Sequence, residues 1–130
     1  MGPVNWLAVV LAAALALAIG IVWNGPMFRS GRQLISGNGE RASGFMVAGV
    51  VLLISSIMLG HSFARIGAET LAVKPWLYFM QTGGVAIAFV IPSVWLTHLR
   101  NRTEPMRRVI DCAFWLVAYL AMGLVFWILA

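Results

Sequence analysis

Long apolar stretches separated by short polar segments dominate the chain. Between residues 6 and 23 there is no charged or strongly polar side chain, and similar runs occupy residues 45–64, 76–97 and 109–130. Each run is close to the ~20 residues that an α-helix needs to cross ~30 Å of hydrocarbon. The runs do not alternate apolar and polar positions, as the strands of a membrane barrel would. The pattern therefore predicts four membrane-spanning helices, over about residues 4–24, 44–64, 76–98 and 108–129.

Turn-forming residues lie in the gaps between these runs, where four spans require the chain to reverse. They are Asn24, Gly25 and Pro26, then Gly37, Asn38 and Gly39, then Gly67 and Pro75, and finally Glu104 and Pro105. The gaps are too short for a folded extramembrane domain. We therefore expect a single all-α domain over residues 1–130, an integral membrane four-helix bundle with short loops.

Basic residues are distributed unevenly among the connections. The second connection holds only Arg65 and Lys74. The first and third hold the rest, which are Arg29, Arg32, Arg41, Arg100, Arg102, Arg107 and Arg108. Basic residues in short loops favour the cytoplasmic side, so both chain ends should face outward. We expect the arginines of the first and third connections to contact lipid head groups, at about 1 kcal/mol each.

Composition supports a membrane location. The chain is 62% hydrophobic and 10% charged, whereas soluble domains carry about 25% charged residues. A domain of this size has too little interior to hide so much apolar surface from water. The net charge of +5 does not indicate nucleic-acid binding, because the sequence lacks a basic helix or an aromatic-basic platform. The expected partners are membrane lipids and other membrane protein chains.

Small residues recur at helical spacing on two of the predicted helices. Such spacing lets helix backbones approach closely in lipid. The candidate packing residues are Ala8, Ala12, Ala16 and Gly20 on the first helix, and Gly84 and Ala88 on the third. Whether they join helices within one chain or between chains is open. Pro92, which follows Gly83 and Gly84, makes the third helix a candidate for a kink.

A few polar side chains lie at depth in the predicted spans. They are Ser55, Ser56, Gln81, Thr82 and Asp111, and together they form a possible polar path. An ionisable residue inside a span suggests a proton or ligand site. Asp111 also has a structural interpretation, because it lies in the first turn of the predicted fourth helix, where the helix dipole favours an acid. There, Arg107 and Arg108 are within reach for pairing on the same helix.

We expect no cofactor, no bound metal and no enzymatic activity. His61 and His98 fall at opposite ends of the predicted bundle, so one haem or metal ion cannot use both. Cys112 is the single cysteine, which excludes an internal disulfide and a thiolate cluster. The sequence shows no nucleophile–base pair or carboxylate pair. The roles of these two histidines and this cysteine are not assigned.

Several short motifs resemble an uncharacterised bacterial family. They are the opening Asn5, Trp6, Leu7, Ala8 and Val9, the exit Trp23, Asn24, Gly25 and Pro26, and the segment with Ile110, Asp111, Phe114, Trp115, Leu116 and Val117. The family resembled consists of small four-span membrane proteins known only as a domain of unknown function. Asn24 departs from the serine or glycine expected at its position. The resemblance implies four spans and a bacterial origin, and it offers no established activity or catalytic residue to transfer to this chain.

Two hypotheses for function follow. The first is a non-enzymatic protein of the bacterial cytoplasmic (inner) membrane that works by association, as a homo-oligomer or as an accessory subunit of a larger complex. The second is an oligomeric channel or transporter for a small or weakly polar solute. The scarcity of polar residues on any one helix face disfavours the second hypothesis, because hydrated pathways are lined by polar groups.

Overall fold

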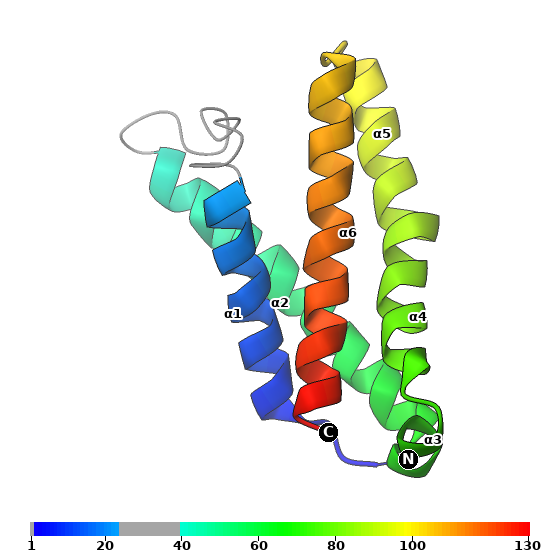
Figure 1. Cartoon of the computed structure of the whole chain (residues 1–130). Helices are drawn as coiled ribbons and strands as arrows, with labels where there is room; N and C mark the ends of the chain where they lie inside the picture. Colours follow the sequence, from blue (N-terminus) through cyan, green and yellow to red (C-terminus); the bar gives the residue numbers. More distant parts are fainter. Residues whose placement is uncertain (1, 24–39) are drawn as a thin grey trace.

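The structure is a computed structural model that describes residues 2–23 and 40–130 (Figure 1). Within these residues all regular structure is helical, which confirms the predicted all-α class. The elements are α1 (Trp6–Val22), α2 (Glu40–Ile66), α3 (Ala68–Val73), α4 (Trp76–Val85), the π-helical segment η3 (Ala86–Val90), α5 (Ile91–Arg100) and α6 (Pro105–Ile128).

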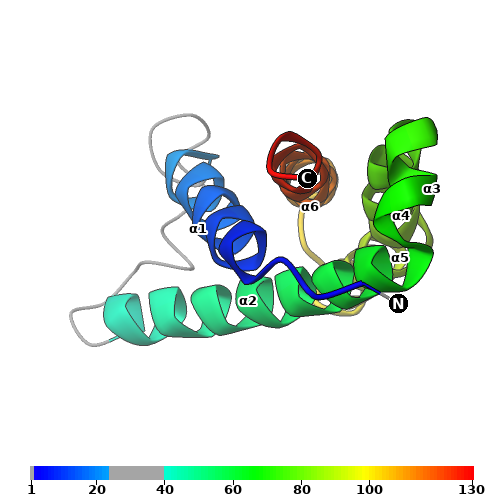
Figure 2. The same cartoon turned by 90° about the horizontal axis from the view of Figure 1, so that it is seen from below.

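Helix α6 lies at the centre of the bundle, between α1 and the continuous rod formed by α4, η3 and α5 (Figures 1 and 2). Helix α2 crosses one side of this row and packs mainly against α1. Both chain ends and α3 lie at one end of the bundle, which we call the terminal end. The turn between α5 and α6 lies at the opposite end, which we call the arginine end.

Three helical stretches are long and apolar enough to cross a membrane: Met46–Ile66, Trp76–Arg100 and Pro105–Ile128. Helix α1 is apolar throughout but has 17 residues. Both α2 and α6 begin several residues before the apolar runs, and α5 ends a few residues after its run. Backbone hydrogen bonds continue a helix past the point where its side chains become polar, so an apolar run marks the lipid-facing part and not the helix end.

A short helix that the sequence pattern does not predict lies in the second connection. Gly67 ends α2 with a φ of 92°, a left-handed conformation that glycine adopts without a Cβ clash. The chain then turns directly into α3, whose Leu71 is buried in the core at 4% exposure. This single apolar anchor holds α3 against the end of the bundle.

The predicted kink site near Pro92 is a π-helical turn. Proline lacks a backbone N–H and its ring clashes with the carbonyl four residues earlier. The helix accommodates the ring with a wider turn, in which the Ile91 N–H donates to the Ala86 carbonyl, five residues back. A π turn contains one more residue than an α turn. Side chains beyond Pro92 are therefore shifted around the helix relative to those before it.

Candidate functional site

The small-residue stripe of α1 lies inside the bundle. Ala8, Ala12 and Ala16 have 0% exposure, and a Cβ on Gly20 would lie 3.3 Å from the Phe114 ring of α6. Helix α1 contacts both α2 and α6. The stripe therefore brings the α1 backbone close to its two neighbours within one chain, as small residues do between membrane helices.

The predicted pair on the third helix lies elsewhere. Gly84 and Ala88 are exposed, and a Cβ built on Gly84 meets nothing within 4 Å. The close approach to α6 is made instead by Gly83, whose Cβ would lie 3.3 Å from Leu120, and by the buried Ala86. Gly84 and Ala88 therefore do not form the contact with α6 in this structure, because the helix rotation places the neighbouring residues inward. A role between chains stays a prediction.

The π turn extends this exposed small-residue face. Ser93 follows Ala88 by five residues, one more than the usual helical step, and the extra residue of the π turn compensates for the difference. Gly84, Ala88, Ser93 and Thr97 are all exposed. The two hydroxyls donate to carbonyls of their own helix, at 2.7 Å and 2.9 Å. We call these four residues the outer small face. The sequence pattern did not predict that Ser93 and Thr97 belong to this face, because Ser93 follows Ala88 by five residues and not by the four of a regular helix.

Three of the deep polar residues, Ser55, Ser56 and Thr82, make hydrogen bonds. Ser56 is fully buried and donates to the Val9 carbonyl of α1 at 2.7 Å. The Tyr119 hydroxyl of α6 donates to Ser55 at 3.0 Å. Thr82 is fully buried and donates to the Tyr78 carbonyl of its own helix at 2.9 Å. Among the described residues, every fully buried side-chain N or O atom has a partner.

These residues do not gather at one level of the bundle. Asp111 precedes Tyr119, the partner of Ser55, by eight residues of α6, which is about 12 Å along the axis. Thr82 packs against Gly123, four residues further along. Gln81 is half-buried. The proposed path is thus distributed over separate interhelical contacts within the described chain.

The contact that Asp111 makes differs from the expectation. Its Oδ2 lies 2.8 Å from His98 Nε2 of α5, within hydrogen-bonding distance, and in the described part of the chain this contact takes the place of the expected pairing with Arg107 or Arg108. Helix α6 begins at Pro105, so Asp111 lies in the second turn and not in the first. His98 Nδ1 lies 3.2 Å from Thr103 Oγ1. The sequence does contain a sign of this contact. His98 and Asp111 lie at nearly equal distances before and after Pro105, so an antiparallel pair of helices that turns there brings them to the same level.

A tight turn closes the arginine end. The Thr103 N–H donates to the His98 carbonyl at 2.9 Å and the Arg102 N–H donates to the Leu99 carbonyl at 3.2 Å. This is the Schellman arrangement, which places its C′ residue in the left-handed region and usually uses glycine there. Here Arg102 occupies it with a φ of 53°. The turn fixes Thr103 beside the imidazole of His98.

The arginines expected at lipid head groups fall into three groups. Arg108 donates to the Thr103 carbonyl at 2.8 Å, and its guanidinium lies 5.7 Å from the Trp95 ring centroid. Arg100 and Arg102 are exposed and Arg107 is half-buried, all at the arginine end. Arg29 and Arg32 lie outside the described residues, and for Arg41 only its place in α2 is described.

The remaining candidates make local contacts. His61 Nδ1 lies 2.9 Å from the Ile57 carbonyl of its own helix, and its ring contacts Trp6. Cys112 is buried, with its sulfur 4.0 Å from the Ile91 carbonyl. Within residues 2–23 and 40–130, no three histidine, cysteine or carboxylate side chains are grouped so that they could hold a metal ion.

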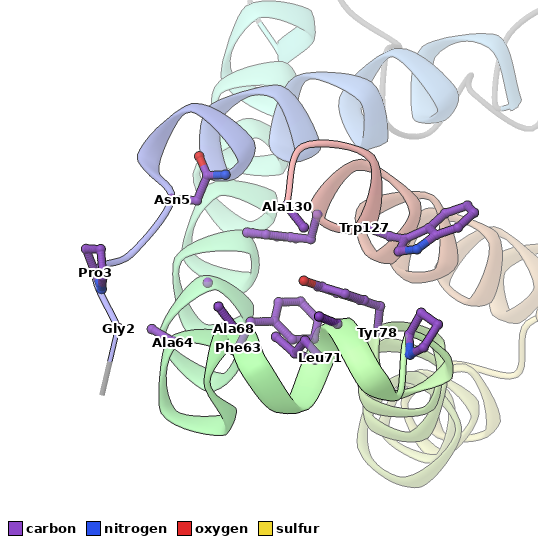
Figure 3. A pocket seen from close by; sticks show the side chains of 14 residues that line it. Gly2, Pro3, Asn5, Phe63, Ala64, Ala68, Leu71, Tyr78, Trp127 and Ala130 are labelled. Carbon is purple, nitrogen blue, oxygen red and sulfur yellow. The ribbon is translucent and has the colours of Figure 1, made fainter.

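A pocket of about 570 Å³ lies at the terminal end (Figure 3). Its walls come from the segment before α1, the end of α2, α3, the start of α4 and the end of α6. The lining residues are Gly2, Pro3, Asn5, Gly60, Phe63, Ala64, Ala68, Leu71, Ala72, Pro75, Tyr78, Phe126, Trp127 and Ala130. The sequence pattern missed it because α3, which forms one wall, was not predicted.

Asn5 joins the chain ends at this pocket. Its Oδ1 accepts from the Ala8 N–H at 3.1 Å, which caps α1, and its Nδ2 donates to the Leu129 carbonyl at 2.9 Å. The Gly2 N–H donates to the Ala64 carbonyl of α2 at 3.1 Å. These contacts hold the first residues across the end of α2 and complete the pocket wall.

This is a small all-α membrane protein. Its long helices are apolar, its surface exposes many large hydrophobic side chains, and the buried polar side-chain atoms of the described residues all have hydrogen-bond partners. Comparison with known families gives a match over residues 7–127 to the family described as protein of unknown function (DUF1761), and the chain belongs to this family. No significant match was found among curated proteins or among solved structures.

Proposed function

We propose that the protein crosses the bacterial cytoplasmic membrane four times and works by associating with other membrane chains through the outer small face, without catalysing a reaction. The fourth span is α1, whose 17 residues lie at the lower end of the range for membrane helices. The arginine end faces the cytoplasm and both chain ends face outward. The partner that we propose to test first is a second copy of this chain.

The observation that carries this proposal is the exposure of Gly84. Its Cβ position is open space, although glycine in a helix interior is less favourable than alanine by up to about 1 kcal/mol. The chain thus presents bare backbone at a position where its own packing does not require it. Small residues on a lipid-facing surface let another helix approach closely, and that approach is what stabilises association in lipid.

The transporter hypothesis receives less support from the geometry. Ser55, Ser56 and Thr82 are engaged in hydrogen bonds within or between helices. A hydrated path needs polar groups that face a common space. In the described chain these three groups stabilise separate contacts and leave few free donors or acceptors for a solute.

The test is association in bilayers measured by fluorescence transfer between donor-labelled and acceptor-labelled copies. Gly84→Leu should lower the association constant by about tenfold or more, because the leucine side chain prevents close backbone approach. The same substitution should leave the monomer folded, since a Cβ at this position meets no other atom within 4 Å.

Ile87→Leu, on the same rod and 60% exposed, is the matched control and should associate like the unmodified chain. Equal transfer for Gly84→Leu and the control would refute the outer small face as the contact. Absence of transfer in the unmodified chain would refute self-association and leave a different membrane chain as the partner, to be sought by the same substitution in native membranes.

A further inference from the structure

The side chains that line the pocket at the terminal end are uncharged and mostly apolar. Its lining contains no aspartate, glutamate, lysine, arginine or histidine. Aromatic rings form much of its wall: Phe63 packs at 4.8 Å from Tyr78 and at 5.0 Å from Phe126, measured between ring centroids. Its volume of about 570 Å³ is within the range of 300–1,000 Å³ that is usual for small-molecule sites.

One polar group of a largely buried residue points into this space without a protein partner. Tyr78 is 5% exposed, and Figure 3 shows its hydroxyl directed into the pocket. Among the described residues its hydroxyl makes no hydrogen bond. Every fully buried side-chain N or O atom of the described residues has a partner, so the unpaired Tyr78 oxygen is itself accessible and can bond to a molecule in the pocket. Two other side chains of the lining can form hydrogen bonds, the Trp127 indole and the Asn5 amide. The Asn5 amide already bonds to the Leu129 carbonyl and the Ala8 N–H.

The pocket lies at the level where tryptophans gather. Trp127 belongs to its lining, and Trp6 and Trp76 begin the two neighbouring helices at the same end. Tryptophan is enriched at the boundary between hydrocarbon and head groups. In a membrane, the contents of the pocket would therefore exchange with molecules that keep a polar group at the boundary and an apolar body below it.

We propose that this pocket binds a neutral single-chain lipid whose hydroxyl or carbonyl group hydrogen-bonds to Tyr78. No lining side chain carries a charge that could pair with a charged head group, and an unpaired charge is costly in such a site, which favours a neutral ligand. The apolar walls accommodate the upper part of the chain. The pocket is separate from the outer small face, so the proposal of lipid binding and the proposal of association can be refuted independently.

Photocrosslinking in bilayer nanodiscs tests this directly. The probes are a long-chain alcohol and an alkane of equal length, each carrying a diazirine, and mass spectrometry locates the labelled residues. We expect the alcohol to label α3 and the end of α6 more strongly than the alkane does. Tyr78→Phe should reduce alcohol labelling roughly three- to tenfold, the effect of one hydrogen bond, and leave alkane labelling unchanged.

A pair of substitutions on α3 provides the steric control. Ala72→Phe fills the pocket from an exposed position and should abolish labelling by both probes. Val73→Phe adds the same ring at a neighbouring residue that is 79% exposed and outside the lining, and it should change nothing. Helix content measured by circular dichroism shows whether each variant is folded.

Three results would overturn the proposal. These are equal labelling by alcohol and alkane, an unchanged alcohol signal in Tyr78→Phe, and displacement of the probe by water-soluble benzyl alcohol but not by unlabelled long-chain alcohol. The last would assign the pocket to a soluble ligand. Because Tyr78→Phe breaks no hydrogen bond within the described chain, its result stands even if Ala72→Phe does not fold.

Discussion

Gly123 permits the closest contact between α4 and α6. A Cβ at this position would lie 2.6 Å from Thr82 Oγ1, 3.2 Å from Thr82 Cγ2 and 3.2 Å from the Tyr78 carbonyl oxygen. Thr82 is fully buried and hydrogen-bonded to that same carbonyl, so it cannot rotate away freely. Overpacking of this kind costs about 1–3 kcal/mol. Gly123→Ala should therefore lower the free energy of unfolding by that amount.

Gly49→Ala is the matched control for this substitution. Gly49 also lies inside a helix, but its Cβ would make only an ordinary contact, 3.9 Å from Leu17. Both substitutions gain the same intrinsic helix propensity, so the difference between them isolates the contact at Gly123. Unfolding is measured as loss of helix content on titration with SDS in mixed micelles.

A double substitution tests whether Thr82 is the cause. Thr82→Ala removes two of the three close atoms and leaves only the Tyr78 carbonyl. In that background, Gly123→Ala should be less destabilising, with a coupling energy of about 1 kcal/mol. If Gly123→Ala and Gly49→Ala unfold at the same SDS concentration, the close packing of α4 on α6 is not as described.

Three further predictions concern polar contacts, each measured by the same SDS unfolding assay. Ser56→Ala should cost about 0.6–1.7 kcal/mol because it removes a buried interhelical hydrogen bond, whereas Ser93→Ala, whose hydroxyl bonds its own helix at the surface, should cost almost nothing; equal losses would contradict this. Arg102→Gly should stabilise the α5–α6 turn by about 1 kcal/mol by removing a left-handed non-glycine residue, and a loss of stability would refute the strain argument. His98→Ala and Asp111→Ala should each cost about 1 kcal/mol or less, and the double variant should cost clearly less than their sum; strict additivity would show that the pair does not interact.

The apolar runs were sufficient to predict where the long helices lie. Length and hydropathy decide this because each helix satisfies its own backbone in lipid. The same signal could not show α3, whose six residues contain only one core anchor, Leu71. Gly67 and Pro75 correctly marked the ends of that connection, but not the turn of helix between them.

The site residues depended on helix rotation, which the sequence pattern does not determine. Gly83 and Gly84 are adjacent and chemically identical, yet one packs near Leu120 and the other faces outward. Likewise, Asp111 has basic residues within reach on its own helix, but the antiparallel neighbour presents His98 at 2.8 Å. Contacts across helices require the relative rotation and depth of two elements, and a single run of residues specifies neither.

The membrane topology is tested most directly by labelling introduced cysteines in spheroplasts with a membrane-impermeant maleimide, after Cys112→Ser has removed the native thiol. In the four-span arrangement, Pro3→Cys and Lys74→Cys, at the terminal end, should react from outside. Arg102→Cys, at the arginine end, should react only after lysis. Labelling of Arg102→Cys in intact spheroplasts, or protection of Pro3→Cys until lysis, would contradict the four-span arrangement with outward chain ends.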